Sequence, residues 1–125
     1  MRRITEKLVS VAETDRTFSR QGDYWVGKCL ICNGPIAFHA ATGEGATLEH
    51  IRAQSRGGTN ALENLGIAHG RCNGEKGKRW DPKRRRSETD YDAFITRLLD
   101  KRRERWRDSD PSASAQAAFS GSRTR

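Results

Sequence analysis

The chain has 125 residues, of which 34% are apolar and 7% aromatic, so it can build one domain with a thin hydrophobic core. Its formal net charge is +8, and no segment approaches the roughly 18 apolar residues that a membrane span needs. The N-terminus lacks an apolar leader, and the cysteine count of three is odd, which argues against a self-contained disulfide framework. We therefore expect a cytoplasmic protein that does not engage a membrane and whose core needs an additional staple.

The first half of the chain is predicted to contain one helix and several short strands. Residues 1–20 place apolar side chains at three- and four-residue steps, which is typical of an amphipathic helix. Residues 22–28 combine a turn with a short extended piece. Residues 36–40 alternate weakly, and the glycine-containing turn after them predicts a hairpin whose return strand is formed by residues 46–51.

The second half is predicted to contain a loop, a strand and two helices. The polar loop over residues 52–60 includes Gly57-Gly58, which permits tight or positive-φ turns. Residues 65–68 are another short apolar strand, and the helix that begins at residue 70 should end before Pro82. A longer helix begins near Thr89 as N-cap. Its apolar face is made by five side chains: Tyr91, Phe94, Ile95, Leu98 and Leu99.

Basic residues are concentrated in two stretches. Residues 76–86 contain seven Lys or Arg residues and one acid. The second cluster lies toward the end of the last predicted helix and consists of Lys101, Arg102, Arg103, Arg105 and Arg107. Such density predicts binding to a polyanion, with an affinity that falls steeply as salt rises. A solvated, solubilising surface is the alternative, but the dense run next to a candidate reactive site favours nucleic acid.

Two pairs of potential metal ligands, Cys29/Cys32 and His69/Cys72, each have a two-residue spacer. This spacing lets both members of a pair contact one ion, and three sulfurs with one nitrogen make a closed, structural Zn²⁺ site. The alternatives are that Cys29 and Cys32 form a disulfide or stay free, and that His69 lies on the surface or serves the reactive site. The two matched pairs favour zinc.

The segment between the pairs carries polar residues that could form a reactive site. His50 lies at the end of a predicted strand, and its neutral imidazole can accept a proton from water. A lone histidine is more often structural, but this one is accompanied by Glu49, Asn64 and Asn73. Asn73 directly follows Cys72, so a bound zinc ion would fix Asn73 near the strand that carries Glu49 and His50.

Together these residues resemble the signature of the HNH endonucleases, over about residues 24–80. The matching elements are an acid–His pair, a loop with paired glycines, an Asn-Leu pair and a zinc knuckle followed by Asn: Glu49-His50, Gly57-Gly58, Asn64-Leu65 and His69 to Asn73. The resemblance implies an α+β protein with a small ββα-metal, treble-clef-like core stapled by a structural zinc. Its strands would be residues 47–50 and 65–68, its helix would begin near Gly70, and helices would flank it at both ends.

The resemblance also implies a role for each site residue. His50 would be the general base that activates water, and Asn64 would orient the loop and, through its amide, the His50 ring. Glu49 and Asn73 would hold one catalytic divalent ion against the phosphate and the leaving 3′-oxygen. Oxygen ligands favour Mg²⁺, with Mn²⁺ as a substitute. Glu49 stands where Asp or His is commoner in the family, and Asn73 stands where His is commoner.

The implied function is a metal-dependent DNA endonuclease, and its rival from another class is a non-catalytic, zinc-stapled nucleic-acid-binding module. The joint spacing of one histidine, one carboxylate and two amides favours the enzyme. Six basic residues could contact backbone phosphates, although each could equally be solvated: Arg52, Arg56, Arg71, Lys76, Lys78 and Arg79. A chain this short could take its sequence specificity from a protein partner.

These inferences divide the chain into four segments. Residues 1–23 are expected to be a helical extension, residues 24–86 the nuclease module, residues 87–107 a basic amphipathic helix and residues 108–125 a disordered tail. The tail is rich in Ser, Ala, Gly and Arg and offers few apolar anchors.

Overall fold

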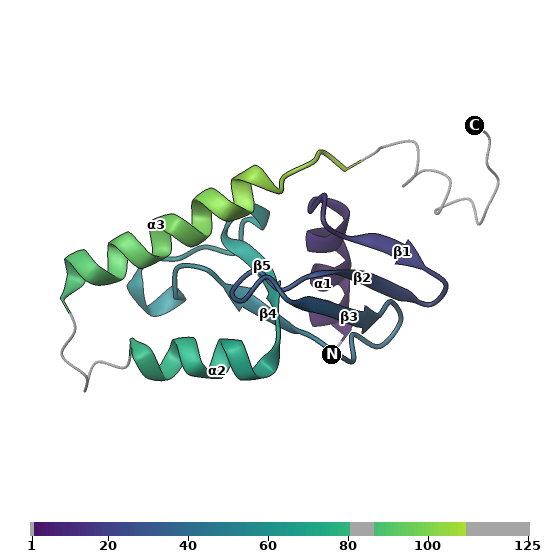
Figure 1. Ribbon diagram of the computed structural model, residues 1–125, viewed down its shortest axis with the longest axis horizontal. Helices are drawn as coiled ribbons and strands as arrows, with labels where there is room; N and C mark the ends of the chain where they lie inside the picture. Colours follow the sequence, from purple (N-terminus) through teal and green to yellow (C-terminus); the bar gives the residue numbers. More distant parts are fainter. Residues whose placement is uncertain (1, 81–86, 110–125) are drawn as a thin grey trace.

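A computed structural model describes residues 2–80 and 87–109 (Figure 1). In chain order its main elements are α1 (Arg2–Glu13), β1 (Ser19–Gln21), β2 (Tyr24–Lys28), β3 (Pro35–His39), β4 (Thr47–His50), β5 (Leu65–Ala68), α2 (Gly70–Arg79) and α3 (Glu88–Glu104). Two 3₁₀ turns, Gln54–Arg56 and Leu62–Asn64, interrupt the connection between β4 and β5. The predicted α+β class is confirmed. None of the helices in the described ranges combines the length and apolar character that crossing a membrane requires.

The strands form two small antiparallel sheets rather than one. The first has the order β1-β2-β3, and the second pairs β4 with β5, with Glu49 opposite Gly66 and His50 opposite Leu65. The predicted hairpin between residues 36–40 and 46–51 is therefore wrong. The turn does form, since the His39 amide donates to the Glu44 carbonyl at 2.9 Å. The chain then leaves this strand, because β3 pairs with β2 and β4 takes β5 as its partner.

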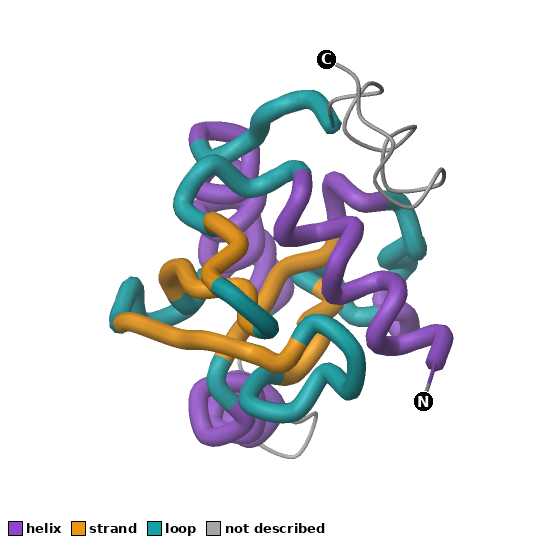
Figure 2. The backbone as a smooth tube through the Cα atoms, turned by 90° about the vertical axis from the view of Figure 1, so that its right-hand side faces the viewer, coloured by secondary structure: helices purple, strands orange, loops and turns teal. Residues whose placement is uncertain are grey.

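Helix α1 provides one half of the core. It lies against β4 and β5 (Figure 2). Leu8, Val11 and Ala12 of its predicted apolar stripe are buried, whereas Ile4 at the start of the stripe is 52% exposed. The buried residues of this cluster are Leu8, Val11, Ala12, Phe18, Ile36, Phe38, Leu65 and Ile67. Burying each such side chain stabilises the folded state by roughly 1.5–3 kcal/mol relative to leaving it exposed. Because its members include residues of α1, β3 and β5, the cluster holds the three-stranded sheet and the β4–β5 pair against one helix.

Helix α3 provides the second half of the core. Its buried residues Tyr91, Ile95 and Leu98 pack with Leu30, Ile51 and Trp80, and this confirms the predicted apolar face. The predicted N-cap is wrong by two positions. The cap is Ser87, whose hydroxyl accepts a hydrogen bond from the Asp90 amide at 3.0 Å, and the helix begins at Glu88. A serine three residues before a free amide satisfies a donor that Thr89, inside the helix, cannot reach.

The basic cluster at the end of α3 does not form the predicted polyanion-binding surface. The Arg102 side chain is 1% exposed and donates to the carbonyls of Leu65, Thr14 and Leu62 at 2.8, 3.0 and 3.2 Å. Lys101, Arg105 and Arg107 also donate to backbone carbonyls. Arg103 alone in this cluster is paired at the surface, with Asp100. Carbonyl groups of the surrounding turns and of the end of α1 can accept more hydrogen bonds than the nearby backbone N–H groups supply. The long basic side chains at the end of α3 reach these carbonyls and supply the additional donors.

The structure bears on the predicted segments in two ways. The N-terminal extension contains β1 as well as α1, and β1 pairs with β2 across the division proposed between residues 23 and 24. Residues 81–86, which contain four of the seven basic residues of the predicted run at residues 76–86, lie outside the described residues, as do residues 110–125 of the predicted tail.

Candidate functional site

The frame of the site is a strand–strand–helix unit with the bounds predicted for it. β4 and β5 pair along their whole length, and α2 begins at Gly70, two residues after β5 ends. Gly66 lets the strands lie close to the first cysteine turn, because a Cβ there would be 2.5 Å from a carbon of Leu30. The N-terminus of α2 therefore faces the turn that carries Cys29 and Cys32.

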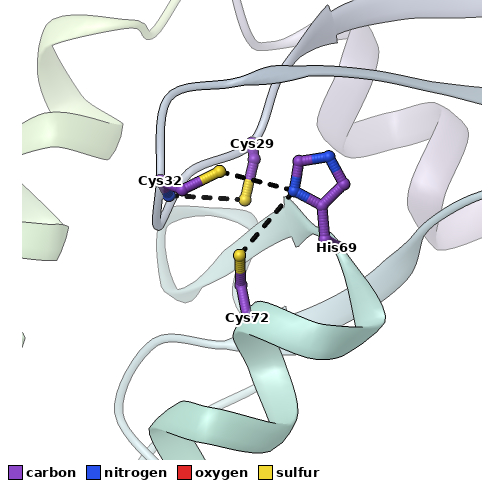
Figure 3. Close-up of side chains that lie close together, drawn as sticks. All are labelled: Cys29, Cys32, His69 and Cys72. Carbon is purple, nitrogen blue, oxygen red and sulfur yellow. Dashed lines mark hydrogen bonds between the residues drawn. The ribbon is translucent and has the colours of Figure 1, made fainter.

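Four side chains from the two predicted pairs converge at the start of α2 (Figure 3). The ligand atoms of Cys29, Cys32, His69 and Cys72 all lie within 4.8 Å of one another. His69 Nδ1 lies 3.4 Å from the Cys32 sulfur and 3.7 Å from the Cys72 sulfur. The three cysteines are not disulfide-bonded. Within the described ranges, no other group of three or more His, Cys, Asp or Glu side chains lies close enough together to hold an ion.

His69 belongs to this cluster and not to the reactive site. Its Nε2 lies 2.9 Å from the carbonyl oxygen of Pro35, which can only accept a hydrogen bond. The proton therefore sits on Nε2, and the lone pair of Nδ1 faces the sulfurs. Metal-binding histidines commonly donate their second ring nitrogen to a carbonyl in this way, so His69 is oriented as a ligand.

The thiols of the cluster need a cation to ionise together. Burial, and after it hydrogen bonding with the neighbouring Cys32, raises the pKa of the Cys72 thiol to about 12. At the exposed Cys32, the Gly34 amide lowers the pKa by donating to the sulfur at 3.3 Å. One thiolate can thus form first, but three at this separation require a positive ion between them. Three sulfurs and one nitrogen with no open position suit Zn²⁺, so the cluster could hold a zinc ion.

The first cysteine turn is held by basic side chains from α3. Asn33 adopts a left-handed φ of 66°, and its side-chain oxygen accepts hydrogen bonds from Lys101 at 3.0 Å and Arg105 at 2.6 Å. Lys101 also donates to the Leu30 carbonyl at 2.6 Å. The residues predicted to bind a polyanion therefore brace the turn that carries Cys29 and Cys32.

A separate cavity of about 540 Å³ lies between β4, the following loop, α2 and the start of α3. It brings together five of the residues predicted for the reactive site: Glu49, His50, Arg56, Asn73 and Lys76. The remaining predicted residues do not line it: Arg52, Asn64, Arg71, Lys78 and Arg79. Tyr91 of α3 closes one side, although the sequence offered no signal for its participation.

Glu49 is buried and already paired with a cation. Its side chain is 2% exposed and forms an ion pair with the Lys76 ammonium, which also donates to the His50 carbonyl at 3.2 Å. Burial raises the pKa of the Glu49 carboxyl, and Lys76 opposes that rise. The side chain of Lys76, one of the residues predicted to contact DNA, is thus only 10% exposed and is turned inward toward Glu49.

The residues present fit a hard divalent ion. A carboxylate and a side-chain amide beside a polar cavity are the ligands that Mg²⁺ accepts while keeping several waters. Asn73 is held at the β4 side by a hydrogen bond from its Nδ2 to Thr47 Oγ1, at 3.3 Å, which leaves its Oδ1 outside that bond.

The side chain of Asn64 is hydrogen-bonded to the backbone of the loop and not to the His50 ring. Its oxygen accepts from the Arg52 amide at 2.9 Å, and its nitrogen donates to the carbonyls of Arg52 and Thr59 at 3.1 and 2.8 Å. The ring of His50 is instead contacted by Asn60, through an Nε2–Oδ1 distance of 2.8 Å. Asn60 carried no sequence signal, because nothing about its spacing separates it from other polar loop residues.

The paired glycines permit the tight loop that Asn64 closes. Gly57 has a φ of 90°, as the turn prediction required. Gly58 lies so close to the Arg52 carbonyl that a Cβ would overlap its oxygen, the same oxygen that accepts from Asn64.

Replacing Gly58 by alanine should lower the free energy of unfolding by about 1–3 kcal/mol, because the added carbon must displace the Arg52 carbonyl. The matched control is Gly74→Ala on α2, where a Cβ meets nothing within 4 Å. Alanine favours a helix over glycine by up to about 1 kcal/mol, so this control should be neutral or slightly stabilising. Urea unfolding of both variants checks the pair, and equal stabilities would show that the loop has room at Gly58.

The arginines of the loop are held against α3. Arg52 pairs with Asp92 at 3.0 Å and Arg56 with Glu88 at 2.8 Å. The Arg56 guanidinium also lies over the Tyr91 ring, 4.0 Å from its centroid. Arg71, Lys78 and Arg79 lie exposed on α2. The six basic residues predicted around the site thus differ in their surroundings. Two are braced by α3, three are exposed on α2, and Lys76 is turned inward toward Glu49.

Comparison with known proteins agrees with this geometry. The family described as HNH endonuclease matches residues 29–79, a range that runs from the first cysteine of the cluster to the end of α2. Comparisons with curated proteins and with solved structures found no match. The matched range contains the four clustered ligands and the residues around the cavity from β4 and α2. Residues 29–79 of this chain match the HNH endonuclease family, and the clustered cysteines match its zinc-knuckle type.

Proposed function

We propose that the protein is a metal-dependent DNA endonuclease that hydrolyses phosphodiester bonds in the cavity between β4 and α2. The observation that carries this proposal is the meeting of Glu49, His50 and Asn73 in one cavity of an HNH domain. They come from two parts of the frame: Glu49 and His50 are the last two residues of β4, and Asn73 lies in the first turn of α2.

His50 acts as the general base. It ends β4 at the rim of the cavity and is partly exposed, so a water molecule can approach its ring. Glu49 and Asn73 would hold the divalent ion, Mg²⁺ or Mn²⁺, which would supply positive charge for the phosphate and the leaving oxygen. General-base catalysis of this kind contributes typically about 10²–10⁴-fold in rate.

The zinc ion has a structural role in this proposal. Its four protein ligands leave no position for water, and Cys72 and Asn73 are adjacent in the first turn of α2. A zinc ion bound to Cys72 and His69 therefore fixes the start of the helix that carries Asn73. The same helix carries Lys76, which pairs with Glu49.

DNA is the proposed substrate because basic side chains surround the cavity. Arg56 lines it, and its guanidinium is kept in place by Tyr91 and Glu88. On α2, Arg71, Lys78 and Arg79 add an exposed positive surface. Contacts of this type position a protein on phosphates without reading bases, so a partner protein that supplies sequence specificity remains part of the proposal.

Cleavage of supercoiled plasmid with Mg²⁺ or Mn²⁺ tests the function. The wild-type protein should convert supercoiled plasmid to nicked or linear forms, and His50→Ala should be slower by about 10²–10⁴-fold. His39→Ala is the matched control, because His39 lies on β3 and its Nδ1 accepts from the Ala41 amide, outside the cavity. That control should cleave at the wild-type rate.

Two results would contradict the proposal. A wild-type protein that retards DNA in a gel but stays inert with every divalent ion would support the alternative, a non-catalytic zinc-stapled nucleic-acid-binding module. Equal rates for His50→Ala and wild type would instead show that a different group activates the water.

A further inference from the structure

The ring of His50 is held by a short chain of amide side chains within the loop. His50 Nε2 lies 2.8 Å from Asn60 Oδ1, and Gln54 Nε2 lies 3.4 Å from the same oxygen. The amide nitrogen of Gln54 can only donate a hydrogen bond, so the Asn60 atom between the two side chains is the accepting oxygen. An accepting oxygen requires a proton on the His50 nitrogen that faces it.

Asn60 is placed by the loop contacts on both of its sides. Asn64 donates to the carbonyl of Thr59 at 2.8 Å, and the Ala61 amide donates to the Thr59 hydroxyl at 3.2 Å. The backbone groups of Thr59 and Ala61, the two neighbours of Asn60, are therefore hydrogen-bonded within the loop, and this holds Asn60 in position. Asn64 reaches the His50 ring only through this intermediate, which explains how a side chain that does not touch the ring can still influence its position.

We propose that Asn60 is the positioning residue of the general base, because its side-chain oxygen holds His50 with the proton on Nε2 and the lone pair on Nδ1. The state of the other ring nitrogen decides which atom of a histidine can accept a proton. The effect on catalysis rests on the proposed nuclease function, whereas the effect on the ring does not.

The chemical consequence concerns a single atom of His50. Nδ1 takes a proton from the attacking water, and the water oxygen forms the new bond to phosphorus. The electrons of the broken phosphorus–oxygen bond leave with the 3′-oxygen, which takes a proton from solvent. Asn60 keeps its hydrogen bond throughout, because His50 carries a proton on Nε2 both before and after the transfer.

The test reads the tautomer of His50 directly. Long-range ¹H–¹⁵N correlation spectra of the zinc-loaded full chain distinguish a ring protonated on Nε2 from one protonated on Nδ1, at about pH 8.5 where histidines are neutral. The chain has three histidines, and the spectrum of His39→Ala assigns one of them. Wild type should show the Nε2–H form at His50. Asn60→Ala should show a mixture of forms, and Asn60→Asp, which keeps an accepting oxygen, should restore the Nε2–H form.

Plasmid cleavage adds the catalytic part of the test. The kcat of Asn60→Ala should fall roughly tenfold, the effect of losing about one hydrogen bond, with the KM for DNA unchanged. A wild-type ring protonated on Nδ1, or an unchanged tautomer in Asn60→Ala, overturns the proposal. A tautomer that shifts without any change in kcat overturns its catalytic consequence. A protein that never cleaves but shows the shift would contradict the nuclease function while supporting the role of Asn60 at the ring.

Discussion

Replacing Cys72 by serine is expected to abolish zinc binding and ordered structure together. The free energy of binding a structural zinc ion is about 10–16 kcal/mol in small zinc-finger peptides, which matches or exceeds the roughly 5–15 kcal/mol by which whole domains are stable. Cys72 occupies the first turn of α2 and lies buried against Cys29 and Ala68. In the variant a serine hydroxyl would replace the thiol that is buried beside Cys29, and the Cys29 and Cys32 thiols would lose the cation that they share with it.

The measurements are zinc content by mass spectrometry and thermal unfolding by circular dichroism. We expect one zinc ion per wild-type chain, and no zinc and no cooperative transition for Cys72→Ser. Treating wild type with a strong zinc chelator should reproduce the behaviour of the variant, and adding Zn²⁺ back should reverse only the effect of the chelator. A zinc-free Cys72→Ser protein that unfolds cooperatively near the wild-type temperature would contradict the structural role of the ion.

The second large effect is expected at Arg102, the basic residue that the sequence assigned to a polyanion-binding cluster. Arg102→Met should lower the free energy of unfolding by about 3–5 kcal/mol. Methionine can fill part of the space, but it cannot donate to the carbonyls of Leu65, Thr14 and Leu62 or to the Thr14 hydroxyl. Buried acceptors without donors account for much of that cost, at about 1–3 kcal/mol for each group.

Arg103→Met is the matched control for this prediction. Arg103 is the next residue of α3, its side chain is 73% exposed, and it pairs with Asp100 at the surface. Exposed pairs contribute about 0–1 kcal/mol, so this variant should unfold within that range of wild type. Urea unfolding separates the two variants. If Arg102→Met and Arg103→Met were equally stable, the hydrogen bonds of Arg102 would not support the fold.

The two variants also discriminate between structure and DNA binding. If the cluster at the end of α3 bound DNA, Arg103→Met would weaken binding at least as much as Arg102→Met, because Arg103 is the more exposed residue. The observed contacts place Lys101, Arg102, Arg105 and Arg107 on the protein's own carbonyls. Helix α3 therefore supports the cysteine turn and the core, although it lies outside the range that matches the HNH family.

The strand and helix bounds of the strand–strand–helix unit could be predicted because each depends on local pattern. Period-two and period-3.6 spacing, a stopping proline and two-residue spacers are properties of a few neighbouring residues. The metal cluster was equally accessible, since each pair is a local turn and the donor types select the ion. His69 joined the cluster as predicted, helped by the Pro35 carbonyl, a contact 34 residues away that no local pattern reveals.

Pairings between distant segments could not be predicted in the same way. The turn at residues 42–45 is a real turn, but whether it makes a hairpin depends on which strand the chain meets next, and β4 meets β5. A basic side chain near the end of a helix can either be solvated or donate hydrogen bonds to buried carbonyls, and the local sequence does not distinguish the two. For Arg102 the choice follows from Thr14, a residue 88 positions away that supplies two acceptors.

The two ligand pairs, the polar residues between them and the short-range periodicity were sufficient to indicate a zinc site, a candidate reactive histidine and several short helices and strands, because these depend on local spacing. The resemblance to the HNH endonucleases added the α+β fold with its ββα core. The packing of the folded chain decided the rest. It assigned Lys76 to Glu49, Asn64 to the loop and Asn60 to the His50 ring. Hydrogen bonds form between groups that packing brings within about 3 Å, and many side chains in a sequence are chemically capable of each of these bonds.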